Sequence, residues 1–429
     1  MEASLHVISK EIIKPSSETP THLRKLKLSY LDQLSPLAYV SMIFFYQANE
    51  SKGLISTNHI QISQQLKQSL SNTLTLFYPL AGRVQDRSVV DCNDAGVEFI
   101  EARVQAQLND ALQEPIIEHL TADATAGALV AVKVTFFDCG GITIGVCVSH
   151  KLADCTSVMT FLNEWAASCR GEAEFPRFSL DLANYFPARE FPESPFLEKQ
   201  LTSNEKKIVT KRFVFDKEKL EALKQAASSP SGSTVEDPTT VEVVSAFIWK
   251  HFIDVIKSEN PEVKKTFAAS HAVSLRGRTS PSLVFDNIFG NCYMTTIAYS
   301  NTTNGEFHDL VTQLRSTIKK VNEDYIAKAQ TGDNYLDDLS KLVSLIMNGE
   351  LELCSFTSWC RYPVYEVDFG WVKPISFRLP SGPVKNTVVL MNSRSGDGIE
   401  ALITMHKDNV EIFENQIKLL SCTATQIDS

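Results

Sequence analysis

The stretch from Ile142 to Asp154 decides the fold and reads Ile-Thr-Ile-Gly-Val-Cys-Val-Ser-His-Lys-Leu-Ala-Asp. Its first seven residues alternate and are rich in Val and Ile, which predicts a buried strand that ends just before His150. The following residues, 156–167, predict a helix with one apolar face. That face carries Val158, Met159, Phe161, Leu162, Trp165 and Ala166. His150 is therefore expected where a buried strand gives way to a helix.

Outward from this stretch, strands and helices are mixed. Residues 130–137 alternate and reach the turn Asp138-Cys139-Gly140-Gly141, so they are expected to form a hairpin with residues 142–148. Residues 61–76 have apolar positions at helical spacing, and the helix is expected to end at the Pro and Gly of residues 77–83. Residues 241–255 predict another amphipathic helix, followed by further strands. The predicted fold class is mixed α/β.

A proline-rich segment divides the chain. Residues 175–204 contain Pro176, Pro187, Pro192 and Pro195 among charged residues, a density that argues against regular helix. A structureless stretch of this length is unusual inside one compact domain. The 429 residues also suit two domains. We therefore expect an N-terminal domain over 1–178, a crossover linker over 179–206 and a C-terminal domain over 207–429. Residues 228–238 are expected to form a surface loop.

Charge and composition exclude several classes of protein. The formal net charge is −10, which argues against binding to a phosphate backbone. The first residues lack the basic and apolar regions of a secretory signal, and no apolar run is long enough for a membrane span. The nine cysteines are scattered, without a Cys-x-x-Cys pair, so neither a disulfide framework nor a metal site is expected. Reduced thiols in a cytoplasmic protein are the simplest expectation.

Two segments place Asp four residues after His, and their surroundings differ. His119 to Asp123 lies in a polar, acidic stretch and is expected at the surface. His150 to Asp154 follows a buried strand, where an enzyme can hold a base rigidly. From these residues alone, His150 could also be a core histidine, and Asp154 could simply cap the following helix.

Further motifs give the chain a family resemblance. His150-x-x-x-Asp154, together with Asp368-Phe369-Gly370-Trp371, resembles the plant BAHD acyltransferases. Residues 78–83, 90–94, 274–278 and 355–361 agree with that family in order and spacing, so the resemblance covers nearly the whole chain.

The resemblance implies a fold and a reaction. The fold would consist of two similar chloramphenicol-acetyltransferase-like domains with a solvent channel between them, and residues of about 366–388 would cross back to the first domain. The activity would be acyl-CoA-dependent O-acyl transfer, most simply from acetyl-CoA to a hydroxyl of a bulky plant metabolite, an alkaloid or a terpenoid. The enzyme would be a monomer with a small-molecule acceptor, and without metal, nucleic acid, membrane or permanently bound cofactor.

The resemblance also assigns roles to residues. His150 would be the general base, and Asp154 would be structural, orienting its loop through Arg276. Contacts with the acyl-CoA co-substrate are expected from Thr239, Arg276, Ser358, Asp368, Gly370 and Trp371. For Thr239 and Ser358, capping and ordinary surface roles are an equal alternative.

The chain departs from the family pattern at three positions: Val372 and Cys155 stand where glycine is usual, and Ser274 where asparagine is frequent. Several alternatives stay open. The donor could be malonyl- or hydroxycinnamoyl-CoA, and the acceptor could be an amine. Cys155 could act as a nucleophile beside His150. The chain could also be a non-catalytic ligand-binding relative. A condensation domain is disfavoured because Ser149 stands where such domains have a second histidine.

Overall fold

A computed structural model describes residues 5–49, 58–112, 116–122, 124, 127–172, 178–190, 208–228, 235–259, 265–279, 285–300, 306–332, 334–382 and 384–424. The chain forms two compact units. The first consists of Met1–Pro192, Asn287–Cys292 and Tyr362–Pro380, and the second of Glu193–Asp286, Tyr293–Arg361 and Ser381–Ser429. The predicted boundaries at 178 and 206 stay predictions, and the second of them lies among residues 191–207, which are outside the described part of the chain.

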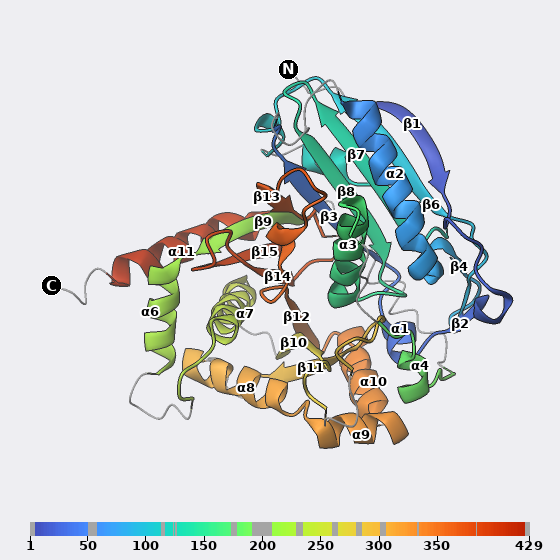
Figure 1. The fold of residues 1–429 in the computed structure, drawn as a ribbon. Coiled ribbons are helices and arrows are strands. Elements are labelled where there is room, and N and C mark those ends of the chain that lie inside the picture. Colours follow the sequence, from blue (N-terminus) through green and yellow to red (C-terminus); the bar gives the residue numbers. More distant parts are fainter. Residues whose placement is uncertain are drawn as a thin grey trace. The chain divides into compact units, whose positions relative to one another are not determined.

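A mixed six-stranded sheet forms the centre of the first unit (Figure 1). Its strand order is β1-β6-β7-β8-β3-β13, in which only the pair β6–β7 is parallel. The strands are β1 (Leu5–Ile13), β3 (Tyr39–Tyr46), β6 (Val97–Val104), β7 (Val130–Phe137), β8 (Ile142–Ser149) and β13 (Ser376–Arg378). A small second sheet pairs β2 (Lys25–Lys27), β5 (Val89–Asp91) and β4 (Arg83–Val84).

The helices that the structure describes in the first unit are α1 (Tyr30–Leu34), α2 (His59–Leu76), α3 (Cys155–Cys169) and α4 (Leu182–Tyr185). Two of them confirm predicted helices. Helix α2 matches the expected helix over 61–76, α3 the one over 156–167, and β7 and β8 form the expected hairpin. Trp165 of α3 donates its indole N–H to the Leu66 carbonyl and to Ser69 Oγ of α2, at 3.2 and 3.1 Å, and so joins the two helices.

Strand β8 is buried along its whole length, although its sequence alternates. Helix α3 follows it directly and buries an apolar face that includes Phe161, Leu162 and Trp165. Both faces of the strand are covered, and His150 follows its last residue. A well-packed strand end restricts the positions that the following residue can take.

The expectation that the proline-rich segment holds no helix is wrong for residues 182–185, which form α4. The prolines stand at 176, 187, 192 and 195, so residues 181–186 are free to take one helical turn. Phe186 is fully buried and packs edge-on against Tyr30 at 5.6 Å between ring centroids. The Tyr30 N–H donates to the Phe186 carbonyl at 3.1 Å, which attaches this segment to α1.

The second unit contains its own mixed six-stranded sheet, ordered β11-β10-β12-β14-β15-β9. Its strands are β9 (Ile208–Phe215), β10 (Thr266–Ser274), β11 (Tyr293–Tyr299), β12 (Leu351–Ser358), β14 (Thr387–Asn392) and β15 (Ile399–His406). Its helices are α6 (Lys217–Ala227), α7 (Thr240–Glu259), α8 (Phe307–Lys319), α9 (Glu323–Thr331), α10 (Asn334–Met347) and α11 (Val410–Ala424). Helix α7 confirms the helix expected over 241–255, and Trp249 on it is fully buried in the core of the unit.

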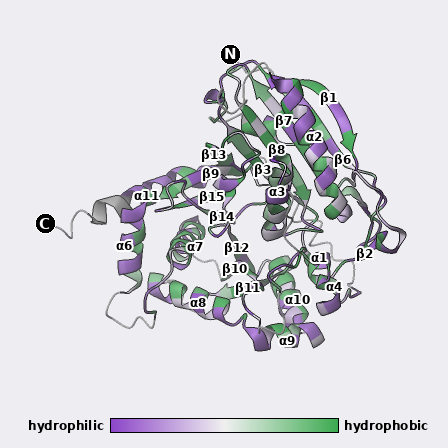
Figure 2. Cartoon of the chain, in the orientation of Figure 1, coloured by the Kyte–Doolittle hydropathy of each residue, from purple (hydrophilic) through white to green (hydrophobic). Residues whose placement is uncertain are grey.

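Helices such as α2 and α6 carry hydrophilic and hydrophobic residues within the same element, as expected for helices with one packed face (Figure 2). Among the helices that the structure describes, none combines the length and apolar character that a membrane span requires.

Each unit combines a mixed sheet with helices, so the prediction of a mixed α/β class is confirmed.

Candidate active site

His150 is held by the backbone on both sides of the strand end. Its N–H donates to the Ala38 carbonyl at 2.8 Å, continuing the pairing of β8 with β3. The next residue, Lys151, is buried and donates from Nζ to the Gln33 carbonyl at 2.8 Å and to the Ser35 carbonyl. The end of α1 and the residues that follow it therefore hold His150 in place through two successive residues.

One side chain that contacts the His150 imidazole is Asn291, which the sequence analysis did not select. His150 Nδ1 lies 3.0 Å from Asn291 Oδ1. The Asn291 amide nitrogen donates to the Asp32 carboxylate at 2.9 Å and to the His150 carbonyl at 2.8 Å. Both of these partners only accept hydrogen bonds, so the amide orientation is fixed, and its oxygen faces the imidazole.

This orientation determines the His150 tautomer. A carbonyl oxygen only accepts, so Nδ1 must carry the proton that it donates to Asn291 Oδ1. In the neutral imidazole the lone pair is then on Nε2. Nε2 can then accept a proton from a substrate group and later return it.

The surroundings of His150 favour the neutral form. Burial lowers its pKa below the usual range, and nearby Lys151 lowers it further. Its own backbone carbonyl, Asp154 and Asn291 raise the pKa, without cancelling the effect of burial. Burial also lowers the pKa of Lys151 to about 8. At neutral pH the imidazole is therefore unprotonated and available as a base.

Asp154 connects the start of α3 with the segment that carries Asn291. One carboxylate oxygen accepts the N–H of Ser157 at 2.9 Å and caps α3, and the other accepts the N–H of Cys292 at 3.1 Å. Ser157 Oγ bonds Gly290 twice, to its carbonyl at 3.0 Å and from its N–H at 2.9 Å. The start of α3 thus fixes the residues on both sides of Asn291.

Gly290 is required by its backbone conformation. Its φ is +143°, and a Cβ there would lie 2.9 Å from the Leu182 side chain. Only glycine takes this conformation without strain. Residue 290 can therefore pass close to α4 and deliver Asn291 to His150.

The Asp368-to-Trp371 segment packs on the elements that flank His150. Phe369 is fully buried, with its ring 4.9 Å from Trp165 of α3 and 6.0 Å from Tyr46 of β3. The Tyr46 hydroxyl donates to the Val367 carbonyl at 2.9 Å, and Asp368 Oδ1 accepts the N–H of Gly370 at 2.8 Å. The predicted acyl-CoA contacts of Asp368, Gly370 and Trp371 stay predictions.

The valine that replaces the family glycine has an ordinary backbone. Gly370 has a φ of +103°, whereas the described non-glycine residues with positive φ are Asp94, Asp237 and Asn386. Val372 is not among them. Position 372 therefore does not take a positive φ in this chain.

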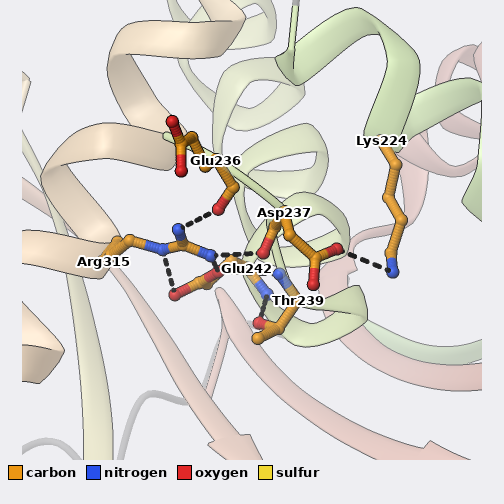
Figure 3. Close-up of polar contacts among 6 residues, drawn as sticks. All are labelled: Lys224, Glu236, Asp237, Thr239, Glu242 and Arg315. Atoms are coloured by element: carbon orange, nitrogen blue, oxygen red, sulfur yellow. Dashed lines mark hydrogen bonds and ion pairs between the residues drawn. The ribbon is translucent and has the colours of Figure 1, made fainter. Parts of the chain in front are cut away.

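Thr239 belongs to the second unit, where it forms a capping box at the start of α7 (Figure 3). Its N–H donates to a Glu242 carboxylate oxygen at 2.8 Å, and its Oγ1 accepts the Glu242 N–H at 3.2 Å. Arg315 of α8 binds the same carboxylate at 2.8 Å and also donates to the carbonyls of Glu236 and Asp237, at 2.6 and 2.8 Å. The capping role expected as the alternative is present.

The other predicted residues are also located. Ser358 is half-buried at the end of β12, and Arg276 lies in the turn after β10, where its N–H donates to Ser274 Oγ at 3.2 Å. The pairing of Asp154 with Arg276 stays a prediction. His119 is exposed, as expected, while Asp123 lies outside the described residues. Within the described part of the chain, no group of His, Cys, Asp and Glu is arranged to hold a metal ion.

Asp32 and Asn291 are the site residues that the sequence analysis missed. Ser29-x-x-Asp32 is a capping-box pattern, which predicts the start of α1 but not the contact of Asp32 with Asn291. Asn291 follows a glycine in an irregular segment, and no periodicity connects it with His150.

Comparisons with known proteins show which family the chain belongs to. The model of the Transferase family matches residues 3–420 of the chain. Stemmadenine O-acetyltransferase from Catharanthus roseus is 39% identical over 431 residues, which cover 97% of each protein. Vinorine synthase from Rauvolfia serpentina is 41% identical over 435 residues, covering 98% of each. The chain belongs to the BAHD acyltransferase family.

The fold of this BAHD member agrees with a solved relative. The crystal structure of vinorine synthase superimposes with a TM-score of 0.78 at 38% identity, covering 95% of this chain and 96% of that one. As a BAHD protein, the chain is an acyltransferase that transfers groups other than aminoacyl groups. BAHD enzymes use CoA thioesters as co-substrates and carry the acyl group to small-molecule acceptors.

Proposed function

We propose that this BAHD enzyme transfers the acetyl group of acetyl-CoA to a hydroxyl of a bulky alkaloid or terpenoid, with His150 as general base. The name of stemmadenine O-acetyltransferase, a full-length relative, supports both an acetyl donor and an alkaloid acceptor. We also propose that the enzyme is a cytoplasmic monomer. The eight cysteines described by the structure are unbridged, which suits a reducing compartment.

The observation that carries the mechanism is the contact between Asn291 Oδ1 and His150 Nδ1 at 3.0 Å. Because an amide oxygen only accepts hydrogen bonds, this contact favours the tautomer with the imidazole lone pair on Nε2. That nitrogen takes the proton of the acceptor hydroxyl while the oxygen attacks the thioester carbonyl. The C–S bond of the tetrahedral intermediate then breaks, and the CoA thiolate leaves with the proton from Nε2. The thioester is already activated, so no acyl-enzyme intermediate is needed.

Residues outside this centre would bind the acyl-CoA. We propose contacts from Thr239, Arg276, Ser358, Asp368, Gly370 and Trp371. Thr239 Oγ1 accepts a hydrogen bond in the capping box, but a hydroxyl can donate its own hydrogen at the same time. The capping role and a contact with CoA are therefore compatible.

The rival mechanism uses Cys155 as a nucleophile. Cys155 is the first residue of α3, and a helix N-terminus favours a thiolate. Direct transfer predicts that Cys155→Ser retains most of the activity. Near-complete loss, together with a trapped acyl-enzyme, would establish the covalent route instead.

The decisive experiment compares wild type with His150→Gln over a panel of acyl-CoAs and a mixed library of alkaloid and terpenoid alcohols. We expect acetyl transfer by the wild type and a loss of about 100- to 10,000-fold in the variant, since general-base catalysis contributes that much. Acyl-CoA binding, measured by calorimetry, should persist in both proteins. Equal turnover by the variant would exclude His150 as the base. Binding without turnover in the wild type would favour a non-catalytic role.

A further inference from the structure

A buried carboxylate lies behind Asn291. Asp32 is 4% exposed and accepts four hydrogen bonds. One oxygen accepts the Ser29 N–H at 3.0 Å and the Ser29 hydroxyl at 2.6 Å. The other accepts the Asn291 N–H and the Asn291 side-chain amide, both at 2.9 Å. Three of these donors are N–H groups, which cannot accept a hydrogen bond from a protonated Asp32.

These bonds describe an ionised carboxylate in an apolar setting. Burial raises the pKa of Asp32, and the bonds from Ser29 and Asn291 oppose that shift. A carboxyl proton could be donated only to Ser29 Oγ, the one partner able to accept. The carboxylate form therefore satisfies this arrangement best.

The carboxylate controls which way the Asn291 amide faces. If the amide were rotated by 180°, its oxygen would face the Asp32 carboxylate and the His150 carbonyl, two acceptors. Its NH₂ group would then point at His150 Nδ1. That nitrogen would have to accept, and the imidazole proton would move to Nε2, where it blocks base catalysis.

We propose that Asp32 is a positioning residue that sets the His150 tautomer through the Asn291 amide. Asp32 bonds Asn291, and Asn291 bonds His150, so the carboxylate acts on the base through one intermediate side chain. The catalytic consequence rests on the function proposed above, in which His150 is the base.

The competing explanation is that Asp32 only caps α1. Ser29 and Asp32 form a capping box in which Ser29 Oγ also accepts the Asp32 N–H at 3.0 Å. Ser29→Ala weakens this box by removing the hydroxyl that bonds Asp32, while Asn291 and His150 keep the bonds described above, so it is the matched control for Asp32→Ala. A pure capping role predicts that the two variants behave alike.

The test is ¹⁵N NMR of the full-length protein with labelled histidine, in which loss of signals in His150→Gln assigns His150. In the wild type, we expect the proton on Nδ1 and a pyridine-type Nε2. Asp32→Ala should move a measurable fraction of His150 to the Nε2-protonated form and lower kcat roughly 10- to 100-fold, the usual effect of losing a side chain that orients a functional histidine. KM for acyl-CoA should change little. Ser29→Ala, which keeps the carboxylate and its bonds to Asn291, should change the tautomer and kcat far less than Asp32→Ala.

Two results would overturn the proposal: a wild-type His150 protonated on Nε2, or an Asp32→Ala protein that keeps the wild-type tautomer. The first needs no variant, so it applies even if Asp32→Ala fails to fold, and Asp32→Asn is the milder second substitution. A wild type inactive with every CoA thioester, but with the predicted tautomer shift in Asp32→Ala, would refute the base role and leave the positioning role standing.

Discussion

Asp154 accepts the backbone N–H of Cys292 at 3.1 Å, across 138 positions of sequence. The aspartate of the His-x-x-x-Asp motif thus fixes the residue next to Asn291, the side chain that contacts His150 Nδ1. The motif joins the base to its positioning group through the backbone, so the proposed mechanism gives His150 the chemistry and Asp154 a structural role.

Asp154→Ala should therefore reduce both stability and turnover. Losing the cap of α3 and the bond from Cys292 is expected to cost about 1–3 kcal/mol of unfolding free energy. Because Asn291 loses its anchor, kcat should also fall, on the order of tenfold or more. Thermal melts and steady-state kinetics on the same preparations measure both effects.

The matched control is Asp216→Ala. Asp216 caps α6 in the same way, accepting the Lys219 N–H at 3.0 Å, and it belongs to the second unit. It should cost roughly 0.5–2 kcal/mol in stability and leave kcat unchanged. If both variants lose stability and neither loses turnover, Asp154 is only a helix cap.

The fall of activity at acid pH should report the protonation of His150. Burial lowers its pKa below 6.5, so the imidazole stays neutral to lower pH than a free histidine. Activity should therefore be constant around neutrality and fall only as the pH drops through an apparent pKa below 6.5. The measurement is kcat/KM against pH, with the residual rate of His150→Gln as reference. A limb centred above 6.5 would contradict the neutral, buried base.

The sequence predicted the parts of the site that lie on regular elements. Strand β8 and helix α3 have clear periodicity, so the position of His150 between them could be inferred. Asn291 could not, because its contact with His150 spans 141 positions and depends on Gly290 passing close to α4. Similarly, the proline density of a thirty-residue segment does not predict α4, because a single helical turn needs only the proline-free residues 181–186.

Thr239 offers a test of the acyl-CoA contacts. Thr239→Ala removes the hydroxyl of the capping box and should cost about 1 kcal/mol of stability. If the hydroxyl also donates to CoA, KM for acyl-CoA should rise several-fold, while Thr239→Ser should keep the wild-type KM. Glu242→Gln perturbs the same box and retains the hydroxyl, so it separates movement of the helix end from loss of the contact. An unchanged KM in Thr239→Ala would mean that Thr239 only caps α7 and does not contact CoA.

The last prediction concerns Gly370 and Val372, which both lie in the segment beside Phe369. Gly370 has a φ of +103°, and a Cβ there would lie 3.3 Å from Arg170 Cγ. Gly370→Ala should therefore lose roughly 1–3 kcal/mol, the usual cost of a strained residue with positive φ. Val372 has no such conformation. Restoring the family glycine there should not stabilise the protein but cost about 0.5–1 kcal/mol, because glycine loses more chain entropy on folding. Thermal midpoints of the two variants and the wild type show whether Gly370→Ala loses more stability than Val372→Gly. A Val372→Gly protein more stable than the wild type would mean that the valine is held under strain and that this turn still needs its glycine.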